Sequence, residues 1–254
     1  MKVFLGALVI LVLLVLYLAR RRPGPQQVSK AVLINLDSDT ERFEYFMKQT
    51  SDFEKPERIQ AVDGHRVEPG DYLTQGALKE LRETETRGYR TKHHQLTRGA
   101  IGCYLSHLSV LRQIKPGEIF LVFEDDIDIR SGVRGEIEKI LRDAPKNWDL
   151  ILLGYNSYLG SDDELSKVRS FWGTCGYLIT YIGAQKFLNE SGDRFDCQID
   201  TFMGWMAASG LLDVYALKSP IVKPSCKFAS NIQNDVRVSF PDSFKYRDKI
   251  LQLN

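Results

Sequence analysis

Four carboxylates stand close together near the middle of the chain, at Glu124, Asp125, Asp126 and Asp128. If a strand continued through them, Asp125 would point away from the face that the other three share. Crowded carboxylates repel one another unless a cation or solvent relieves the charge. Two carboxylates with several waters suit a hard divalent cation such as Mg²⁺ or Mn²⁺, which often also binds substrate phosphates. A solvated acidic turn is the alternative, and the cluster alone does not decide between the two.

The residues around the cluster predict how it is positioned. Residues 119–123 are a continuous apolar run, typical of a strand buried on both faces. Alternating strands and helices indicate an α/β sheet, and ligands bind at the carboxyl edge of such sheets. We therefore expect the carboxylates at that edge. Comparable patterns predict strands at 31–36, 58–62, 148–154, 173–180 and 211–217, and helices around 43–47, 99–113, 135–142, 183–188 and 200–206.

Three stretches are predicted to have little regular structure. Residues 65–98 are polar with charges of both signs, and we interpret them as a long, partly helical excursion that could cover the site. Residues 155–169 are predicted to form a polar loop. The chain from Pro220 onward is predicted to be irregular.

Composition restricts the class of protein. A length of 254 residues, with 43% hydrophobic and 26% charged residues, suits one globular domain with small additions. A formal net charge of +1 gives no indication of nucleic-acid binding. The turn after the first predicted strand carries neither a dinucleotide fingerprint nor a P-loop. The four cysteines show no CxxC or Cys/His metal spacing, and they could form two disulfides or remain four thiols.

The N-terminus predicts a membrane anchor. Residues 3–19 are uncharged and rich in Leu and Val, at the short end of the roughly 17–25 residues of a spanning helix. A cleaved signal peptide is the alternative, but three arginines at 20–22 follow the run instead of a cleavage site. We expect a single-pass anchor over 1–22, a linker over 23–30 and a catalytic domain over 31–254. The arginines weakly favour a cytoplasmic domain, whereas a glycan on the Asn189 sequon would place it in a lumen.

An ordered series of motifs resembles glycosyltransferase family 25, which includes lipooligosaccharide and procollagen galactosyltransferases. Each motif alone is unspecific, but together they follow the family's order over residues 32–232. They are Ile-Asn-Leu-Asp at 34–37 with Arg42, Arg-Ile-Gln-Ala-Val-Asp-Gly at 58–64, Gly-Ala-Ile-Gly-Cys-Tyr-Leu-Ser-His at 99–107, Phe-Glu-Asp-Asp at 123–126, Trp-Asp at 148–149, Gly-Thr-Cys-Gly-Tyr-Leu-Ile at 173–179, Gly-Ala-Gln-Lys at 183–186 and Ile-Asp at 199–200.

The resemblance implies a GT-A-like, Rossmann-like mixed sheet that binds a nucleotide sugar, with helices on both faces. It implies inverting transfer from a UDP-sugar, often UDP-galactose, to a hydroxyl of a glycan, lipid-linked glycan or glycoprotein. Glu124, Asp125 and Asp126 would correspond to the family's DxD-like motif, which holds Mn²⁺ (or Mg²⁺) against the diphosphate. Asp200 is the candidate base, with Asp149 as the second candidate. A helix N-cap is the alternative role for Asp200.

Further residues are expected to contact the donor, namely Asn35, Asp37, Arg42, Asp63, His107, Gly173 and Thr174. Several alternatives stay open. Arg42 could pair with phosphate or with a carboxylate, and His107 could touch donor or metal or be structural. Gly173 could approach the sugar or serve strand packing. Trp148 and Trp172 could stack on an acceptor sugar or lie in the core.

One position departs from the family's pattern, because Cys175 stands where a His is common. Rate or donor preference could therefore differ. The membrane segment, absent from many bacterial relatives, suits a eukaryotic or viral enzyme with its catalytic domain in the ER or Golgi lumen. A UDP-glucose-using enzyme of the same family and an inactive homologue acting as a binding subunit are the alternatives to a galactosyltransferase.

Overall fold

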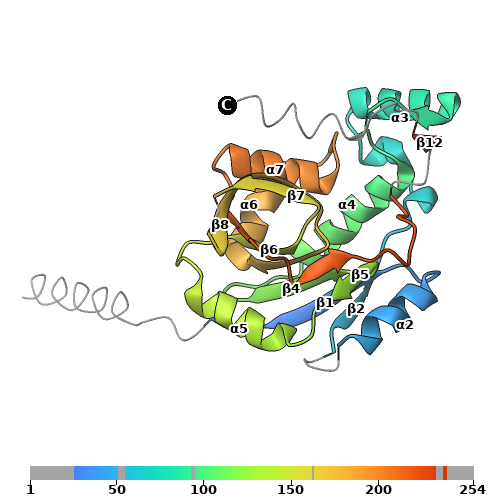
Figure 1. The fold of residues 1–254 in the computed structure, drawn as a ribbon. Coiled ribbons are helices and arrows are strands. Elements are labelled where there is room, and N and C mark those ends of the chain that lie inside the picture. The colour runs from blue at the N-terminus through green and yellow to red at the C-terminus, as the bar shows by residue number, and fades with distance from the viewer. Residues whose placement is uncertain (1–25, 51–54, 93–94, 162, 233–236, 239–254) are drawn as a thin grey trace, which may run out of the picture.

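An eight-stranded mixed sheet forms the centre of the protein (Figure 1). The computed structural model describes residues 26–50, 55–92, 95–161, 163–232 and 237–238. The sheet has the strand order β2-β1-β4-β9-β6-β10-β8-β7. Its strands are β1 (Lys30–Asn35), β2 (Glu57–Gln60), β4 (Ile119–Glu124), β6 (Leu150–Gly154), β7 (Ser157–Gly160), β8 (Leu165–Trp172), β9 (Gly176–Thr180) and β10 (Val214–Leu217).

Strand directions bring several strand ends to one edge of this sheet. Strands β1, β2 and β4 are parallel, whereas β9 runs antiparallel between β4 and β6. The carboxyl ends of β1, β4 and β6 and the amino end of β9 therefore meet at the same edge. The register places Ile34 beside Glu124, and Phe123 beside Gly176. This edge carries the predicted carboxylates.

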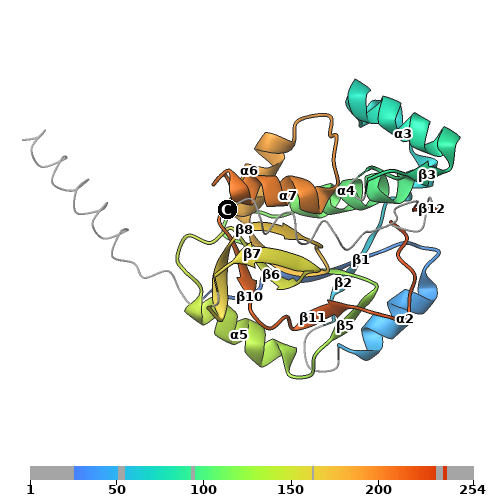
Figure 2. The ribbon, with the colours of Figure 1, turned by 45° about the horizontal axis from the view of Figure 1, so that its top comes forward.

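Helices cover both faces of the sheet, as the family resemblance implies (Figures 1 and 2). On one face lie α4 (Arg98–Leu111), α6 (Tyr181–Ser191) and α7 (Ile199–Ala208), with α3 (Gln75–Arg87) beyond α4. On the other face lie α2 (Thr40–Lys48) and α5 (Val133–Asp143). Two apolar clusters fill the two interfaces, because each helix turns one apolar stripe toward the sheet.

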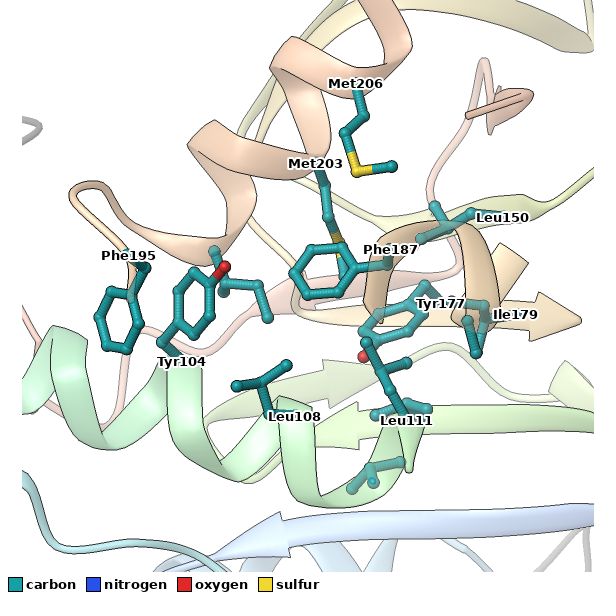
Figure 3. Packing of buried hydrophobic residues seen from close by; sticks show 14 of the residues in the cluster. Tyr104, Leu108, Leu111, Leu150, Tyr177, Ile179, Phe187, Phe195, Met203 and Met206 are labelled. Carbon is teal, nitrogen blue, oxygen red and sulfur yellow. The ribbon is translucent and has the colours of Figure 1, made fainter. Parts of the chain in front are cut away.

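The larger of these clusters fixes α4 relative to the sheet. Figure 3 shows Leu108 and Leu111 of α4 packing toward Phe187 of α6 and Tyr177 of β9. The Tyr104 ring of α4 stacks on a phenylalanine ring at a centroid distance of 3.9 Å. Burial of side chains of this size contributes about 1.5–3 kcal/mol each. The face of α4 that carries His107 is therefore held in a defined position.

Close backbone packing brings the first half of α4 against the turn that follows β2. A Cβ atom on Gly102 would lie 2.4 Å from the Val62 carbonyl oxygen, and one on Gly64 would lie 1.8 Å from the Arg98 carbonyl oxygen. The Ser106 hydroxyl also accepts a hydrogen bond from the Val62 amide at 2.8 Å. Only glycine fits at these two positions, because any side chain would meet backbone atoms that cannot move aside.

The structure corrects the predicted polar loop at 155–169, which contains β7 and part of β8. Strand β8 buries Val168 and Phe171 on one face and pairs with β10. Ser166 is also buried, because its hydroxyl donates to the carbonyl oxygens of Ser161 at 2.6 Å and Asp163 at 2.8 Å. A buried polar residue interrupts the apolar alternation, so the sequence pattern hides the strand.

The prediction of irregular structure after Pro220 is also wrong in part. Strand β11 (Val222–Pro224) pairs with β5 (Ile127–Ile129), and β12 (Arg237–Val238) pairs with β3 (Tyr89–Arg90). Strands this short carry too few residues to produce a periodic pattern. The partly helical character predicted for 65–98 is confirmed by α3 and by two 3₁₀ turns, Gly64–Arg66 and Pro69–Asp71.

The predicted membrane anchor, residues 1–22, lies outside the described residues. Among the helices that are described, none has the length and hydrophobicity needed to cross a bilayer. Part of the predicted linker packs on the domain. The Ser29 amide donates to the Ile119 carbonyl oxygen at 2.8 Å, and the Trp148 indole donates to Gln26 at 2.9 Å.

Candidate functional site

Two adjoining cavities lie at the edge where β1 and β4 end and β9 begins. The larger has a volume of about 480 Å³ and the smaller of about 230 Å³. Glu124, Asp126 and Cys103 line both, so the two cavities meet at the carboxylates. Of the predicted site residues, Asn35, Arg42, Asp63, His107 and Asp125 line the larger cavity, and Gly173, Thr174 and Asp200 line the smaller.

Glu124, the last residue of β4, is a fixed carboxylate. Its Oε1 accepts a hydrogen bond from the Thr174 hydroxyl at 2.7 Å and lies 3.3 Å from His107 Nε2. Burial opposes the charge, but the hydrogen bond and charge of His107, and then Thr174, hold the pKa of Glu124 below its usual value. Both contacts go to Oε1, so Oε2 has no hydrogen-bond partner within the part of the chain that the structure describes.

His107 links Glu124 to the interior of the domain. Its side chain is fully buried on α4, and Nδ1 lies 2.7 Å from the Tyr177 hydroxyl while Nε2 faces Glu124. The two rings also stack, with centroids 5.7 Å apart. His107 therefore orients Glu124, and it does so from a position on the wall of the larger cavity.

Asp125 and Asp126 have different environments although they are adjacent. Asp125 is buried, with Oδ1 accepting from Arg42 Nη1 at 3.0 Å and Oδ2 from Asn35 Nδ2 at 2.7 Å. Asp126 has only the Arg42 guanidinium at 3.6 Å as a described cationic neighbour. Burial, followed by the charge of Glu124, raises the pKa of Asp126 to about 7. Asp125 therefore anchors the strand end, whereas Asp126, beside Glu124, is the carboxylate of the three with the weakest described partner.

Arg42 is directed at protein partners. Besides Asp125, its guanidinium donates through Nη2 to the Ala229 carbonyl oxygen and to Asn231 Oδ1, the latter at 3.1 Å. The side chain is buried. Of the two predicted roles, this geometry favours the ion pair over a phosphate contact. Arg42 also ties the end of β4 to the segment 229–232, which borders the larger cavity.

Asp200 lies in the smaller cavity, and it is not the N-cap of its helix. The N-cap of α7 is Gln198 and Asp200 is the second helical residue, so the N-cap alternative was wrong. Its Oδ2 accepts from the Gly173 amide at 2.9 Å, and its Oδ1 from the Thr201 amide at 2.7 Å. Burial raises the pKa of Asp200 although these two amides oppose the rise. A carboxylate with a raised pKa is better suited to accept a proton.

Gly173 is required where it donates to Asp200. Its φ of +91° lies in a region that side chains disfavour. A Cβ atom there would also lie 2.9 Å from the Asn156 amide nitrogen. Of the predicted roles for Gly173, a positioning role is favoured, since its amide holds Asp200 toward the cavity that both residues line.

The structure places Asp149 far from these cavities. Leu150 pairs with Ile179, which in turn pairs with Phe120, so Asp149 lies near the amino end of β4. That is about 15 Å from Glu124 at a rise of ~3.3 Å per residue. Its carboxylate accepts from Lys186 at 2.5 Å and from a backbone amide at 2.8 Å. This position corrects the prediction that Asp149 is a second candidate base.

Asp37 also lies outside both cavities. Its exposed carboxylate accepts from Arg58 and Gln60 of β2, each at 2.6 Å. Asp63 lines the larger cavity and caps the N-terminus of a 3₁₀ turn by accepting from the His65 amide at 3.0 Å. Two tryptophans were candidates for stacking on an acceptor sugar. Trp148 is buried in the core, whereas Trp172 is 37% exposed beside Gly173.

Sequence reasoning missed the role of the segment 229–232 as a wall of the site. Asn231 donates to Asp39 at 2.6 Å, and the Thr97 hydroxyl donates to the Ile232 carbonyl oxygen at 3.0 Å. Ser230 and Ile232 line both cavities. The sequence offers no motif that would have identified this wall, because it acts mainly through packing and backbone contacts. All four cysteines are free thiols, which corresponds to one of the two predicted alternatives.

The fold is that of an open α/β protein, with paired carboxylates in a cavity at the carboxyl edge of the sheet, which is where ligands bind in such folds. The sequence model of glycosyltransferase family 25 (LPS biosynthesis protein) matches residues 28–203, so the protein belongs to this family. The family predicted from the motifs is thereby confirmed.

Curated relatives are similar to part of the chain. Procollagen galactosyltransferase 1-B of Xenopus laevis is 31% identical over 200 residues, which is 72% of this chain and 32% of the relative. Inactive glycosyltransferase 25 family member 3 of Homo sapiens is 28% identical over 199 residues, 72% of this chain and 32% of the relative. Procollagen galactosyltransferase 2 of Mus musculus is 29% identical over 198 residues, which is 71% of this chain and 31% of the relative.

The chain spans about a third of the length of these curated relatives. The relatives include proteins named as enzymes and proteins named as inactive at comparable identity. Family membership therefore implies a sugar donor and an acceptor, and it leaves the activity of this chain to be tested.

Proposed function

We propose that the protein is a divalent-metal-dependent glycosyltransferase that moves a sugar, with galactose as the expected sugar, from a UDP-sugar to an acceptor hydroxyl. One observation carries the proposal. Glu124 and Asp126 are two carboxylates at the junction of two cavities, and Asp126 has only Arg42, at 3.6 Å, as a described cationic partner. Membership in a family of glycosyltransferases supplies the class of substrate.

The carboxylate oxygens of Glu124 and Asp126 are ligand atoms that fit Mn²⁺ or Mg²⁺. Hard cations bind carboxylate oxygen and keep several waters or substrate oxygens. The raised pKa of Asp126, caused by burial and by the charge of Glu124, is the strain that a cation would relieve. Glu124 and Asp126 would hold the ion, and Asp125 would act indirectly through Arg42 and Asn35. When bound, the ion would offset charge on the UDP leaving group.

The two cavities would hold the two ends of the donor. The larger cavity, at about 480 Å³, is within the range of about 300–1,000 Å³ typical of small-molecule sites and would take the nucleotide. Asn35, Asp63 and the segment 229–232 form its walls. The smaller cavity, with Gly173, Thr174 and Asp200, would take the transferred sugar and the approaching acceptor hydroxyl. A GT-A-like mixed sheet is the architecture that this arrangement implies.

Asp200 would act as the base of an inverting displacement. The acceptor O–H proton passes to the Asp200 carboxylate while the acceptor oxygen bonds to the anomeric carbon. The bond from that carbon to the UDP oxygen breaks in the same step, and UDP leaves. The amides of Gly173 and Thr201 hold the carboxylate in place, and its raised pKa favours proton uptake.

Anchoring and compartment are part of the proposal. Residues 1–22 would form a single-pass anchor, with residues 31–254 as a catalytic domain in the ER or Golgi lumen. Asn189 is exposed on α6, so it would be accessible to glycosylation there. A glycan on Asn189 of the full chain made in a secretory system would support the lumenal topology, and an unmodified site would favour the cytoplasmic side.

Hydrolysis of UDP-sugars tests the function directly. Purified protein with Mn²⁺ should release UDP fastest from UDP-galactose, and a preference for UDP-glucose would identify the alternative donor. Asp200→Asn should keep UDP binding and lose turnover, because it removes only the proton acceptor. Binding of Mn²⁺–UDP without turnover of any UDP-sugar would point to an inactive binding subunit. Absence of metal-dependent UDP binding would overturn the proposal.

A further inference from the structure

Helix α4 carries a thiol and an imidazole one turn apart at the wall of the site. Cys103 and His107 are four residues apart, so their side chains share one face of the helix. Glu124 approaches them from the end of β4. One ligand atom of each residue lies within 4.8 Å of the others, and no other group of three His, Cys, Asp or Glu side chains meets this condition in the described part of the chain.

The distances are close to those that a tetrahedral ion requires. Nitrogen and oxygen ligands at about 2.0–2.1 Å from Zn²⁺ lie about 3.3 Å apart. His107 Nε2 and Glu124 Oε1 are already 3.3 Å apart. A thiolate at about 2.3 Å from the ion would lie ~3.6 Å from each of them. Since Cys103 Sγ is within 4.8 Å, a small side-chain movement would complete the triad.

Groups behind the triad orient two of its ligands. His107 Nδ1 faces the Tyr177 hydroxyl at 2.7 Å, and a hydroxyl can accept as well as donate. If Nδ1–H is donated to Tyr177, loss to water of the Nε2 proton that faces Glu124 leaves an Nε2 lone pair for the metal, which is the usual arrangement of a metal-bound histidine. Thr174 holds Glu124 Oε1 from the other side at 2.7 Å. Cys103 lines both cavities, so an ion can reach the triad from solvent.

We propose that Cys103, His107 and Glu124 form a site for Zn²⁺ or another thiophilic divalent ion. Sulfur and imidazole ligands select such ions, whereas the Glu124–Asp126 pair offers only oxygen and selects Mn²⁺ or Mg²⁺. The Cys103 thiol binds as the thiolate and its proton passes to water. Water or Asp126, which lines the same cavities, completes the coordination.

The shared ligand makes the two kinds of ion competitors. Glu124 cannot serve both ions fully, so Zn²⁺ at the triad weakens the binding of Mn²⁺ with UDP. This competition rests on the proposed function, but zinc binding itself does not. The site would make donor binding respond to the zinc concentration around the protein.

Cobalt spectroscopy on the nucleotide-free protein tests the site, first in the wild type and then in a variant. One equivalent of Co²⁺ should give a thiolate-to-cobalt charge-transfer band in the near ultraviolet, and Zn²⁺ should abolish it. Cys103→Ser should lose the band and weaken Zn²⁺ binding, measured against a chelating dye, by at least about 100-fold. A wild-type protein without the band, or equal Zn²⁺ affinity in Cys103→Ser, would overturn the proposal.

Cys175→Ser is the matched control. Cys175 is buried and lines the smaller cavity, but it is not in the triad. Burial first, and then the charges of Glu124 and Asp126, raise the pKa of its thiol. This variant should keep the cobalt band, and its loss would refute the assignment to Cys103.

Competition is measured separately by electron paramagnetic resonance of Mn²⁺ with UDP. Zn²⁺ should release bound Mn²⁺ from the wild type and release less from Cys103→Ser. Zinc bound through Cys103 without loss of Mn²⁺ would overturn the shared ligand. If Mn²⁺–UDP does not bind at all, the proposed function fails, and the cobalt spectrum still decides the zinc site.

Discussion

Replacing the two neighbouring aspartates one at a time should change stability in opposite directions. Asp125 is buried between Arg42 and Asn35, with contacts at 3.0 and 2.7 Å. Asp125→Asn removes the negative charge opposite the buried Arg42 guanidinium. It also replaces the oxygen that accepts from Asn35 Nδ2 with an NH₂ group, which cannot accept that hydrogen bond. Removing one partner of a buried ion pair costs about 3–5 kcal/mol. We expect the free energy of unfolding to fall by that amount.

Asp126→Asn should instead stabilise the metal-free protein at alkaline pH. The pKa of Asp126 is raised from 3.8 to about 7, so the folded protein binds this proton more tightly than the unfolded chain. The resulting stability is complete below pH ~4 and is lost as the pH rises through ~7. The full effect is at most about 4 kcal/mol. Partial exposure, 26% of the side chain, and the attraction to Arg42 reduce it, so we expect a gain of about 1–2 kcal/mol at pH 8.

Urea unfolding with EDTA, followed by circular dichroism at pH 8 and pH 5, measures both effects. The gain of Asp126→Asn should be clearly smaller at pH 5 than at pH 8, because the folded wild type is protonated at pH 5, and it should vanish only below pH ~4. The loss in Asp125→Asn should be present at pH 8. A neutral Asp125→Asn, or an Asp126→Asn that is destabilised at pH 8, would refute the division between an anchoring and a metal-facing aspartate.

Three further variants, with Gly76→Ala as a control for the first, test how the site is built. Gly102→Ala should lower the free energy of unfolding by at least about 1–3 kcal/mol in urea titrations, because its Cβ would lie 2.4 Å from a backbone oxygen. Gly76→Ala should instead raise it by ~0.5–1 kcal/mol, because no atom lies within 4 Å of a Cβ at that helical position. Tyr177→Phe should cost about 1–3 kcal/mol in the same assay, since it removes the partner of buried His107 Nδ1, and an unchanged stability would contradict that contact. Asp149→Asn should lower the melting temperature in calorimetry and leave metal-dependent UDP binding intact; a loss of that binding in folded protein would return Asp149 to the site.

Much of the fold could be predicted because buried strands and amphipathic helices leave periodic patterns. The apolar run before Glu124 marks β4, and the run ending at Asn35 marks β1. Strand β8 escaped prediction because Ser166 is buried with local hydrogen bonds that no periodicity reveals. Its neighbour β7 is mostly half-buried, and its sequence carries no apolar alternation that would mark a strand.

The candidate site could be located from sequence, but the roles of its members could not. Position after a strand placed Glu124, Asp125 and Asp126 at one edge of the sheet. Their division into anchoring and metal-facing groups depends on Arg42, which is more than 80 residues away in the chain. Asp149 looked comparable to Asp200 as a motif residue. Only the sheet register shows that it lies at the opposite edge, because strand direction is not encoded in a local pattern.

The central claim is that Glu124 and Asp126 hold a divalent cation against the diphosphate of a UDP-sugar. Calorimetric titration of UDP into the protein with Mn²⁺, for the wild type and for Asp126→Ala, tests it most directly. Asp149→Asn serves as the control at the far edge of the sheet. We predict Mn²⁺-dependent binding in the wild type and the control, and its loss in Asp126→Ala. Equal Mn²⁺–UDP affinity in wild type and Asp126→Ala would contradict the account.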